Sequence, residues 1–273
     1  VGQNACVEVD GSAYWMSENG FFRYAGKLES LPCLVEDHVY DDINLESGNQ
    51  MVSAGLNNLF GEVIWFYPTS SSSVVNRMVA YNYFDSIPQR PVWTVGTLAR
   101  TMWRDSAIFG KPHALEYDAD TDTSFDVVGN TEGRTTYYEH ETGTDQVKGG
   151  TVTAITANIL SGDFDITQRI VGNQMTGIAD FRGDGENIMK IRRFIPDFIS
   201  QTGDTRVTLN LRNFPSDTAS SSSLGPFTIT SSTSKVDTRA RARAIALKIE
   251  NTSTSQSWKL GTFRLDTQPD GRR

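Results

Sequence analysis

Paired short apolar runs, joined by turn residues, are the feature that most restricts the fold of this chain. The first pair occupies residues 13–16 and 21–24, with an Asn-Gly dipeptide between the runs. Asn-Gly is the strongest short hairpin signal because both residues tolerate a positive φ. A second pair at 62–67 and 77–83 is joined by a polar, serine-rich loop. These pairs predict β-hairpins.

The hairpins recur as imperfect four-stranded units. A third, looser copy starts near Gly133, and strand candidates near Gln50 and Pro91 lie between the copies. Such recurrence, with aromatic residues at similar places, is typical of β-propeller blades. We therefore expect residues 1–186 to form a propeller-like region. Because a closed ring usually needs about four blades, we expect this region to be incomplete and the chain, which begins at Val1, to be a processed product or part of a longer one.

From about Asn187 the pattern changes to alternating strands separated by polar loops. This pattern predicts a small antiparallel β-sandwich or barrel-like region over residues 187–273, whose last strands could complete the propeller. No long amphipathic pattern with helix caps occurs in the sequence. The expected fold class is therefore all-β, with propeller-like four-stranded blades followed by this C-terminal β region.

A ladder of arginines stands near the end of the chain. In an extended strand at 238–250, Arg239, Arg241 and Arg243 share one face, and alanines occupy the other. The arginines are then spaced by about 6.6 Å, twice the rise per residue. Like charges on one strand face are unfavourable unless anions lie opposite them. We therefore predict that the three arginines contact an acidic partner or phosphate groups.

Charge is distributed unevenly along the chain, whose net charge is −8. Residues 235–273 contain nine basic and four acidic residues, a net charge of +5, which leaves −13 for the rest. An acidic body argues against an ordinary nucleic-acid-wrapping protein, whereas a local basic strand suits contact with a specific partner. No apolar run approaches the length of about 18 residues that a membrane-spanning helix needs, so no membrane span is predicted.

One acidic loop has part of a metal-binding pattern. Asp118, Asp120 and Asp122 have the spacing of the first three ligands of a calcium loop. However, Thr123 stands where such a loop has glycine, and Gly129 stands where it has a bidentate glutamate. We therefore expect a solvated acidic loop, with no metal and no other cofactor.

Catalytic motifs are equally sparse, since no HExxH, GxSxG or phosphate-binding glycine loop occurs. Glu139 and Glu141 could share one side of a strand, as paired carboxylates do in glycosidases, but exposed charges at a hairpin end are the simpler interpretation. Trp65, Trp93 and other strand aromatics could form a sugar-binding platform, but their pattern favours a core position. We do not expect an enzyme.

Four stretches together resemble a known family. They are AYWMSENGFFRYAGKLESLPC, GEVIWFYPTSSSSVVNRMVAYNYFDSIPQRPVWTVGTLARTMWRD, YYEHETG, and RARARAIALKIE with the following WKLGTFRLDTQPDGRR. In this order they are similar to the tail nozzle proteins of short-tailed bacteriophages, also called tail tubular or packaged-DNA stabilisation proteins. The resemblance covers nearly the whole chain, but this sequence lacks an N-terminal region that family members usually carry.

The resemblance implies a structural protein of the virion tail, assembled in the host bacterial cytoplasm and without enzymatic activity. Family members form a ring, expected here to be a homo-hexamer, below the portal and its adaptor, and this nozzle retains and then conducts the genome. The implied partners are the portal adaptor, tail fibre or spike proteins, and genomic DNA during its transient passage. The family combines a β-propeller with further β domains.

In such a ring Arg239, Arg241 and Arg243 recur in every subunit. They could form ion pairs with acidic loops of a neighbouring subunit or meet phosphates in the channel, and we favour the subunit interface because tight binding of DNA would slow its ejection. The alternative function, from a different class, is a carbohydrate-binding or glycan-degrading β-propeller that recognises a host surface.

Overall fold

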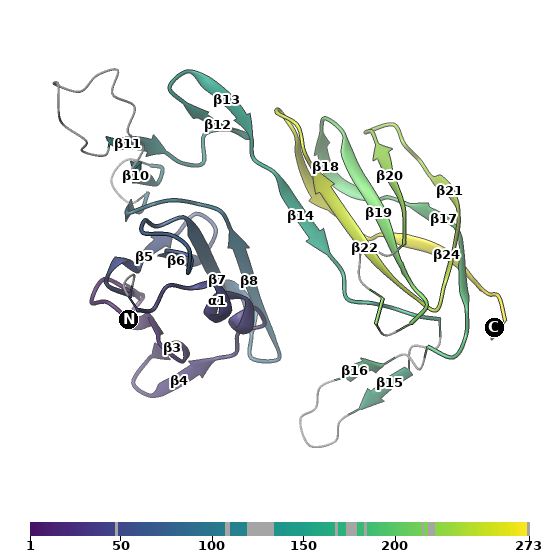
Figure 1. Cartoon of the computed structure of the whole chain (residues 1–273), viewed down its shortest axis with the longest axis horizontal. Helices are drawn as coiled ribbons and strands as arrows, with labels where there is room; N and C mark the ends of the chain where they lie inside the picture. The colour runs from purple at the N-terminus through teal and green to yellow at the C-terminus, as the bar shows by residue number, and fades with distance from the viewer. Residues whose placement is uncertain are drawn as a thin grey trace. The chain divides into compact units, whose positions relative to one another are not determined.

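The structure is a computed structural model, and its regular elements are nearly all antiparallel β-strands (Figure 1). It describes residues 1–46, 49–106, 110–118, 134–166, 169–172, 179–182, 185–214, 216–217 and 222–271. Helices within these residues are limited to α1 (Glu36–Asp42) and the short 3-10 helix η1 (Asn49–Met51). The expectation of a predominantly β protein is confirmed. The chain divides into two compact units, unit 1 (Val1–Thr142) and unit 2 (Gly143–Arg273).

Unit 1 begins with a four-stranded antiparallel sheet whose strands pair in sequential order. They are β1 (Cys6–Val9), β2 (Ser12–Ser17), β3 (Gly20–Tyr24) and β4 (Leu28–Leu31). The first predicted hairpin is confirmed as β2 and β3, in which Ser17 pairs with Gly20 across a two-residue turn. Gly20 has a φ of 130°, a conformation that glycine adopts readily and other residues do not. The turn is therefore centred one residue earlier than the Asn-Gly pair predicts.

The next two sheets of unit 1 also follow sequential order. The second sheet contains β5 (Ser53–Asn57), β6 (Glu62–Tyr67), β7 (Arg77–Ile87) and β8 (Arg90–Gly96). The third contains β9 (Met102–Arg104), β10 (His113–Asp118) and β11 (Arg134–Glu139). The second predicted hairpin is confirmed as β6 and β7. The third predicted copy, near residue 133, instead contributes the single strand β11, which pairs with β10.

Strand β6 is the centre of unit 1 because both of its faces are buried. Its odd-numbered residues Val63, Trp65 and Tyr67 belong to a core cluster shared with the first sheet. Its even-numbered residues Ile64 and Phe66 belong to a separate cluster that continues toward β9 of the third sheet. Full burial of one large apolar side chain contributes about 1.5–3 kcal/mol. Both faces of the second sheet are thus stabilised by packing against other parts of unit 1.

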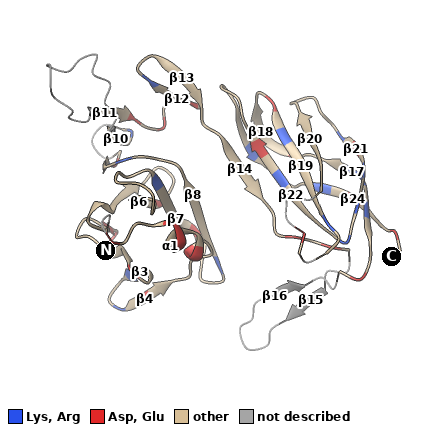
Figure 2. Ribbon diagram, viewed as in Figure 1, with Lys and Arg blue, Asp and Glu red and all other residues tan. Residues whose placement is uncertain are grey.

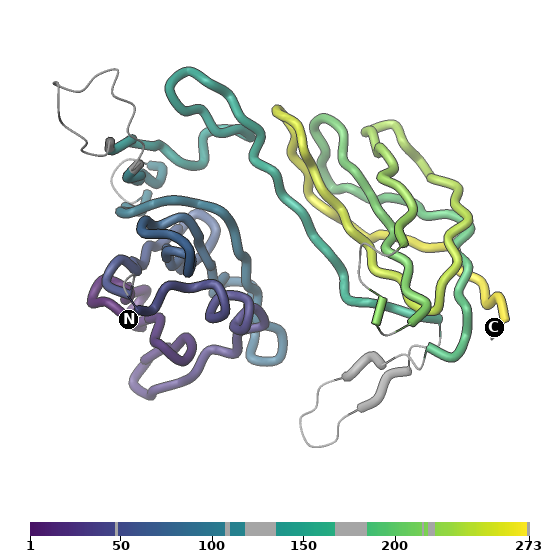
Figure 3. The backbone as a smooth tube through the Cα atoms, in the orientation of Figure 1, coloured from purple at the N-terminus to yellow at the C-terminus, as the bar shows by residue number. Residues whose placement is uncertain are grey.

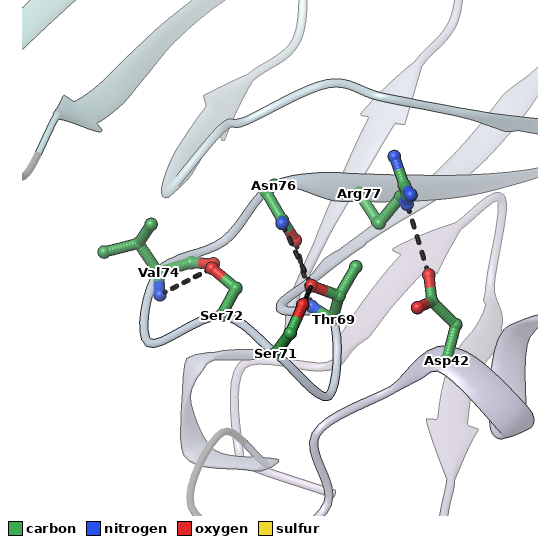
Figure 4. A network of polar contacts seen from close by, with 7 residues as sticks. All are labelled: Asp42, Thr69, Ser71, Ser72, Val74, Asn76 and Arg77. Carbon is green, nitrogen blue, oxygen red and sulfur yellow. Dashed lines mark hydrogen bonds and ion pairs between the residues drawn. The ribbon is translucent and has the colours of Figure 1, made fainter.

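Polar side chains order the serine-rich connection between β6 and β7 (Figure 4). The Asn76 amide accepts a hydrogen bond from the Thr69 backbone N–H at 2.9 Å and donates one to the Thr69 hydroxyl at 3.1 Å. Arg77 Nε donates to the Asp42 carboxylate at 3.2 Å and so ties the end of α1 to β7. Short polar side chains that bond nearby backbone groups favour such turns over continued strand.

Unit 2 contains two larger sheets. One has the order β14-β22-β19-β20, with β14 at Ala157–Leu160, β22 at Ala244–Asn251, β19 at Thr205–Arg212 and β20 at Ser223–Ile229. The other has the order β21-β17-β24, with β21 at Val236–Ala242, β17 at Met189–Ile195 and β24 at Arg264–Pro269. Ile191 of β17, Ala240 of β21, Leu209 of β19 and Ile245 of β22 are all buried in one cluster. The two sheets therefore pack on a shared core.

Three two-stranded pairs are also described in unit 2. They are β12 (Asp145–Lys148) with β13 (Thr151–Ala154), β15 (Arg169–Gly172) with β16 (Ala179–Arg182), and β18 (Phe198–Thr202) with β23 (Ser257–Leu260). The last pair places Phe198 and Trp258 against a second buried cluster that contains Phe194 and Ile249. This pair therefore extends the core of unit 2.

The boundary between the units follows Thr142, whereas the change in sequence pattern places it between residues 186 and 187. Phe164 and Ile245 exchange two backbone hydrogen bonds, both at 3.0 Å. The Asn251 side chain donates to the Ile155 carbonyl at 2.9 Å, and β14 pairs with β22. Residues 155–164 are thus attached to the C-terminal strands by long-range pairing, which a local sequence pattern does not contain.

Neither helix of the described residues has the length or the apolar character that crossing a membrane requires.

Candidate functional site

The first part of the arginine ladder lies on β21. Thr238, Ala240 and Ala242 are buried on the inner face of this strand, whereas Arg239 and Arg241 are exposed on the outer face. Small alanine side chains allow the strand to pack closely on β17 and the shared core. The predicted separation of an alanine face from an arginine face is therefore confirmed for β21.

Arg243 lies at a bend rather than within a continuous strand. The expected single strand at 238–250 is wrong, because β21 ends at Ala242 and β22 begins at Ala244. The chain, which can be followed in the yellow-green part of the tube in Figure 3, leaves one sheet here and enters the other. After the bend the large side chains of two odd-numbered residues, Ile245 and Ile249, enter the core. The bend allows odd-numbered arginines to face outward and odd-numbered isoleucines to face inward.

The three arginines have different partners. Arg241 forms an ion pair with Asp270, which follows β24. Arg243 Nη1 donates to the backbone carbonyls of Gly185 and Glu186, both at 2.9 Å. Arg239 makes no ion pair or hydrogen bond with any residue in the described part of the chain. Two members of the ladder thus have partners within unit 2, whereas the Arg239 side chain is exposed.

Strand β17 adds two cations beside Arg239. Lys190 pairs in register with Arg241, and a register shift between Ile191 and Arg193 leaves Arg192 in a bulge and exposed. A groove of about 280 Å³ is lined by Lys190, Arg192, Arg193, Asp237, Thr238 and Arg239. Figure 2 shows basic residues along the strands of this unit.

The charges in this groove are not balanced by the carboxylates beside it. Asp237 forms an ion pair with Arg193, with 3.2 Å between carboxylate oxygen and Nε, and Asp266 lies 3.9 Å from the same guanidinium. Lys190, Arg192 and Arg239 form no ion pair with any described residue. We call the groove that carries these three side chains the basic groove. Arginine offers a planar set of donors that matches a carboxylate or phosphate, so the groove can bind an anionic group.

Lys190 and Arg192 were missed by the sequence analysis, which considered only the Arg-Ala stretch. A signal was present, because the apolar positions 189, 191 and 194 change from a spacing of two to a spacing of three. An extra residue in a strand pattern is typical of a β-bulge, which redirects a side chain. The bulge thus brings a further guanidinium to the outer face.

Unit 1 contains a second cluster of titratable groups, around Arg100. This side chain is 3% exposed, and its Nη1 lies 3.1 Å from the Glu116 carboxylate. Its Nε donates to His140 Nε2 at 2.9 Å, and its guanidinium carbon lies 3.9 Å from the centre of the Tyr138 ring. Burial, with a smaller effect from Arg100, lowers the pKa of His140 to about 4. The neutral imidazole thus accepts a hydrogen bond from the Arg100 guanidinium inside unit 1.

The two glutamates that flank His140 do not form a facing pair in the structure. Glu139 forms an ion pair with Lys111 at 3.4 Å. Glu141 has a φ of 58° and accepts from the Asn57 amide at 3.2 Å. Each carboxylate therefore has a partner of its own, which agrees with the simpler interpretation of charges at the end of a strand.

Trp65, Trp93 and Trp103 pack in the core, as the sequence pattern favoured, whereas Trp15 of β2 is half-buried and stacks on Phe22 without joining either cluster. Trp65 is fully buried and donates to the Ala5 carbonyl at 3.0 Å. Trp93 and Trp103 are half-buried and pack on the two clusters around β6.

A different aromatic feature of unit 1 was not predicted from the sequence. It is a cavity of about 520 Å³ in unit 1 whose lining includes Tyr14, Tyr81, Tyr83, Arg23 and Glu29.

The candidate calcium loop lies mostly outside the described residues. Asp118 is the last residue of β10, whereas Asp120 and Asp122 lie outside the described residues. Among the residues that the structure describes, no group of three or more His, Cys, Asp or Glu side chains is arranged to hold a metal ion.

No protein-family model matches the chain, and a search of curated proteins finds no match. The function is therefore inferred from the geometry above and from the resemblance carried by the sequence.

Proposed function

We propose that this chain is a structural component of a bacteriophage tail, a subunit of a ring-shaped nozzle that lies below the portal and its adaptor and retains and then conducts the genome. In this proposal the chain works in the virion, assembles as a homo-hexamer in the host cytoplasm, contacts the adaptor and fibre or spike proteins, and catalyses no reaction. The resemblance to tail nozzle proteins motivates it.

The observation that carries the proposal is the burial of β6 on both faces. In a β-propeller every blade is a sequential antiparallel sheet that packs against a neighbouring blade on each side. The sheets β1-β2-β3-β4 and β5-β6-β7-β8 have this strand order, and β6 contributes to the core on both sides. We propose that these sheets and β9-β10-β11 are propeller-like blades, and that the two larger sheets of unit 2 form a β-sandwich.

The absence of enzymatic activity is supported by the use of the titratable groups. Arg100 binds both Glu116 and His140, Glu139 binds Lys111, and Glu141 binds Asn57. Groups that are already paired in this way are poorly placed to exchange protons with a substrate.

Particle size and shape test the proposal. The purified chain should form rings in negative-stain micrographs, with a native mass near six times 30.2 kDa. Antibodies against it should label the tails of the virions from which the gene derives. A protein that stays monomeric at all concentrations and labels no tail would contradict the proposal.

The tyrosine-lined cavity of unit 1 supports a second candidate, a carbohydrate-binding propeller. Aromatic faces and a few charged groups in one concave site are the usual means of binding a sugar. The rings of Tyr14 and Tyr81 lie 6.2 Å apart, and Arg23 lies 5.7 Å from the Tyr14 ring. A glycan array should then show binding that Tyr81→Ala abolishes, and incubation with the bound glycan would reveal any hydrolysis.

A further inference from the structure

The two units of this chain carry opposite charges. Unit 1 contains 20 acidic and 8 basic residues, a net charge of −12, and unit 2 contains 13 acidic and 17 basic residues, a net charge of +4. Opposite potentials on two surfaces steer their association and fix their orientation. A molecule with one acidic and one basic unit can therefore bind a second copy of itself from head to tail.

The basic groove is the part of unit 2 best suited to such a contact. Lys190, Arg192 and Arg239 come from two neighbouring strands and have no carboxylate partner in the described part of the chain. Holding three cations together without anions is unfavourable, and carboxylates supplied from outside would offset that cost.

Helix α1 is a dense acidic segment of unit 1 (Figure 2). Asp37 and Asp41 are exposed and Glu36 is half-exposed, whereas Asp42 is already bound by Arg77. Leu34, just before the helix, is 77% exposed and could supply an apolar contact beside the charges. We call Glu36, Asp37 and Asp41 the acidic face.

We propose that the acidic face of one copy binds the basic groove of a second copy. Three carboxylates meet three cations, and the exposed Leu34 lies at the rim of the contact. The two surfaces are different, so the contact is heterologous and produces a closed ring when the rotation between copies closes. This inference deepens the proposed function, because it names the interface by which the nozzle ring would be held together.

Phosphate groups of nucleic acid are the other anions that could occupy the groove. Unit 1, with a net charge of −12, repels a uniform polyanion at long range but attracts the basic unit of a second copy, so nucleic acid is disfavoured. Nucleic acid is therefore treated as an outcome that would overturn the proposal.

Charge reversal on each surface tests the contact in the full chain. Variant one is Arg192→Glu with Arg239→Glu, and variant two is Asp37→Lys with Asp41→Lys. Each double variant by itself should weaken self-association at least about tenfold. Sedimentation velocity at low salt measures this association. The matched control, Arg206→Glu with Lys259→Glu, reverses two exposed cations of unit 2 outside the groove and should associate like the wild type.

Mixing the two variants is the decisive measurement. Variant one keeps its acidic face and variant two keeps its groove, and the two reversed surfaces are also complementary. An equimolar mixture should therefore recover association to within about threefold of the wild type, and added salt should weaken all of these assemblies.

Four results would overturn the inference. One is a mixture that stays dissociated, and a second is a groove variant that associates like the wild type. A third is a control that loses association as strongly as variant one. The fourth is a groove variant that loses binding to a labelled DNA duplex while it keeps its assemblies. If the wild type forms rings in any of these cases, the proposed nozzle function survives and only the proposed interface is wrong. A wild type that never associates contradicts both the nozzle function and the interface.

Discussion

At the scale of single residues, the arginine ladder separates into groups with different tasks. Arg243 binds two backbone carbonyls at the bend between β21 and β22, and Arg241 binds Asp270. Arg239 has neither kind of partner among the described residues and joins Lys190 and Arg192. Three similar residues in a repeated sequence thus differ because of what the fold places opposite each of them.

This difference predicts unequal effects on stability. Arg243→Gln should lower the free energy of unfolding by about 1–3 kcal/mol, because carbonyls of residues 185 and 186 lose a charged donor. Arg239→Gln should change it by less than about 0.5 kcal/mol, as is usual for an exposed side chain. Urea denaturation measures both, and equal losses for the two variants would contradict the assignment.

His140 predicts how stability depends on pH. Its pKa is lowered to about 4 in the folded state from an ordinary value of 6.5. Between these values the unfolded chain binds a proton that the folded chain does not, so stability falls as the pH falls from about 6.5 to about 4. His140→Gln, whose amide oxygen can still accept from Arg100, should flatten this part of the profile.

Thermal unfolding at a series of pH values between 7 and 4 makes this measurement. The control is His38→Gln, which removes an exposed histidine on α1 and should keep the wild-type slope. A wild-type slope in His140→Gln would show that the imidazole is not held neutral.

At the scale of elements, the close approach of the second and third sheets depends on a residue without a side chain. A Cβ atom at Gly55 of β5 would lie only 2.6 Å from Cδ1 of Trp103 on β9. The Trp103 indole also donates to the Leu56 carbonyl at 2.8 Å. The indole therefore lies directly on the backbone of β5, and only glycine leaves room for it.

Gly55→Ala should consequently destabilise the protein by about 1–3 kcal/mol, the usual cost of overpacking. The matched control is Gly96→Ala on β8, where the new Cβ would meet the flexible end of Met78 at 3.1 Å and the cost should be smaller. Denaturant titration followed by tryptophan fluorescence compares the two variants. If Gly96→Ala proves the more harmful change, the packing described for β5 and β9 is wrong.

At the scale of the whole molecule, two compact units predict two blocks of cooperative unfolding. Trp65→Phe should lower the transition of unit 1, because the Ala5 carbonyl loses its buried donor. Phe164→Ala should lower the transition of unit 2, because Phe164 packs on the core of that unit. Scanning calorimetry of the full chain separates these effects. If the boundary lay between residues 186 and 187, both substitutions would fall in the same unit and would lower the same transition.

Much of the architecture could be read from local patterns. The β2–β3 hairpin, β6 with β7, and the alanine and arginine faces of β21 are confirmed, because alternation of side chains and turn residues are properties of neighbouring positions. The third hairpin was not reproduced, and the chain divides into compact units after Thr142, whereas the boundary at 186/187 stays a prediction. Both depend on which distant strand a segment pairs with, and a local pattern does not encode that choice.

The sequence by itself determined the all-β class, the strand positions and the uneven charge. Only the tertiary structure decided which charges are neutralised, since Arg241 and Arg243 find partners in segments far along the chain, and which cations gather beside Arg239. The physical reason is that periodicity fixes the face on which a side chain lies, whereas the pairing of strands and a bulge at Arg192 fix what lies across from it.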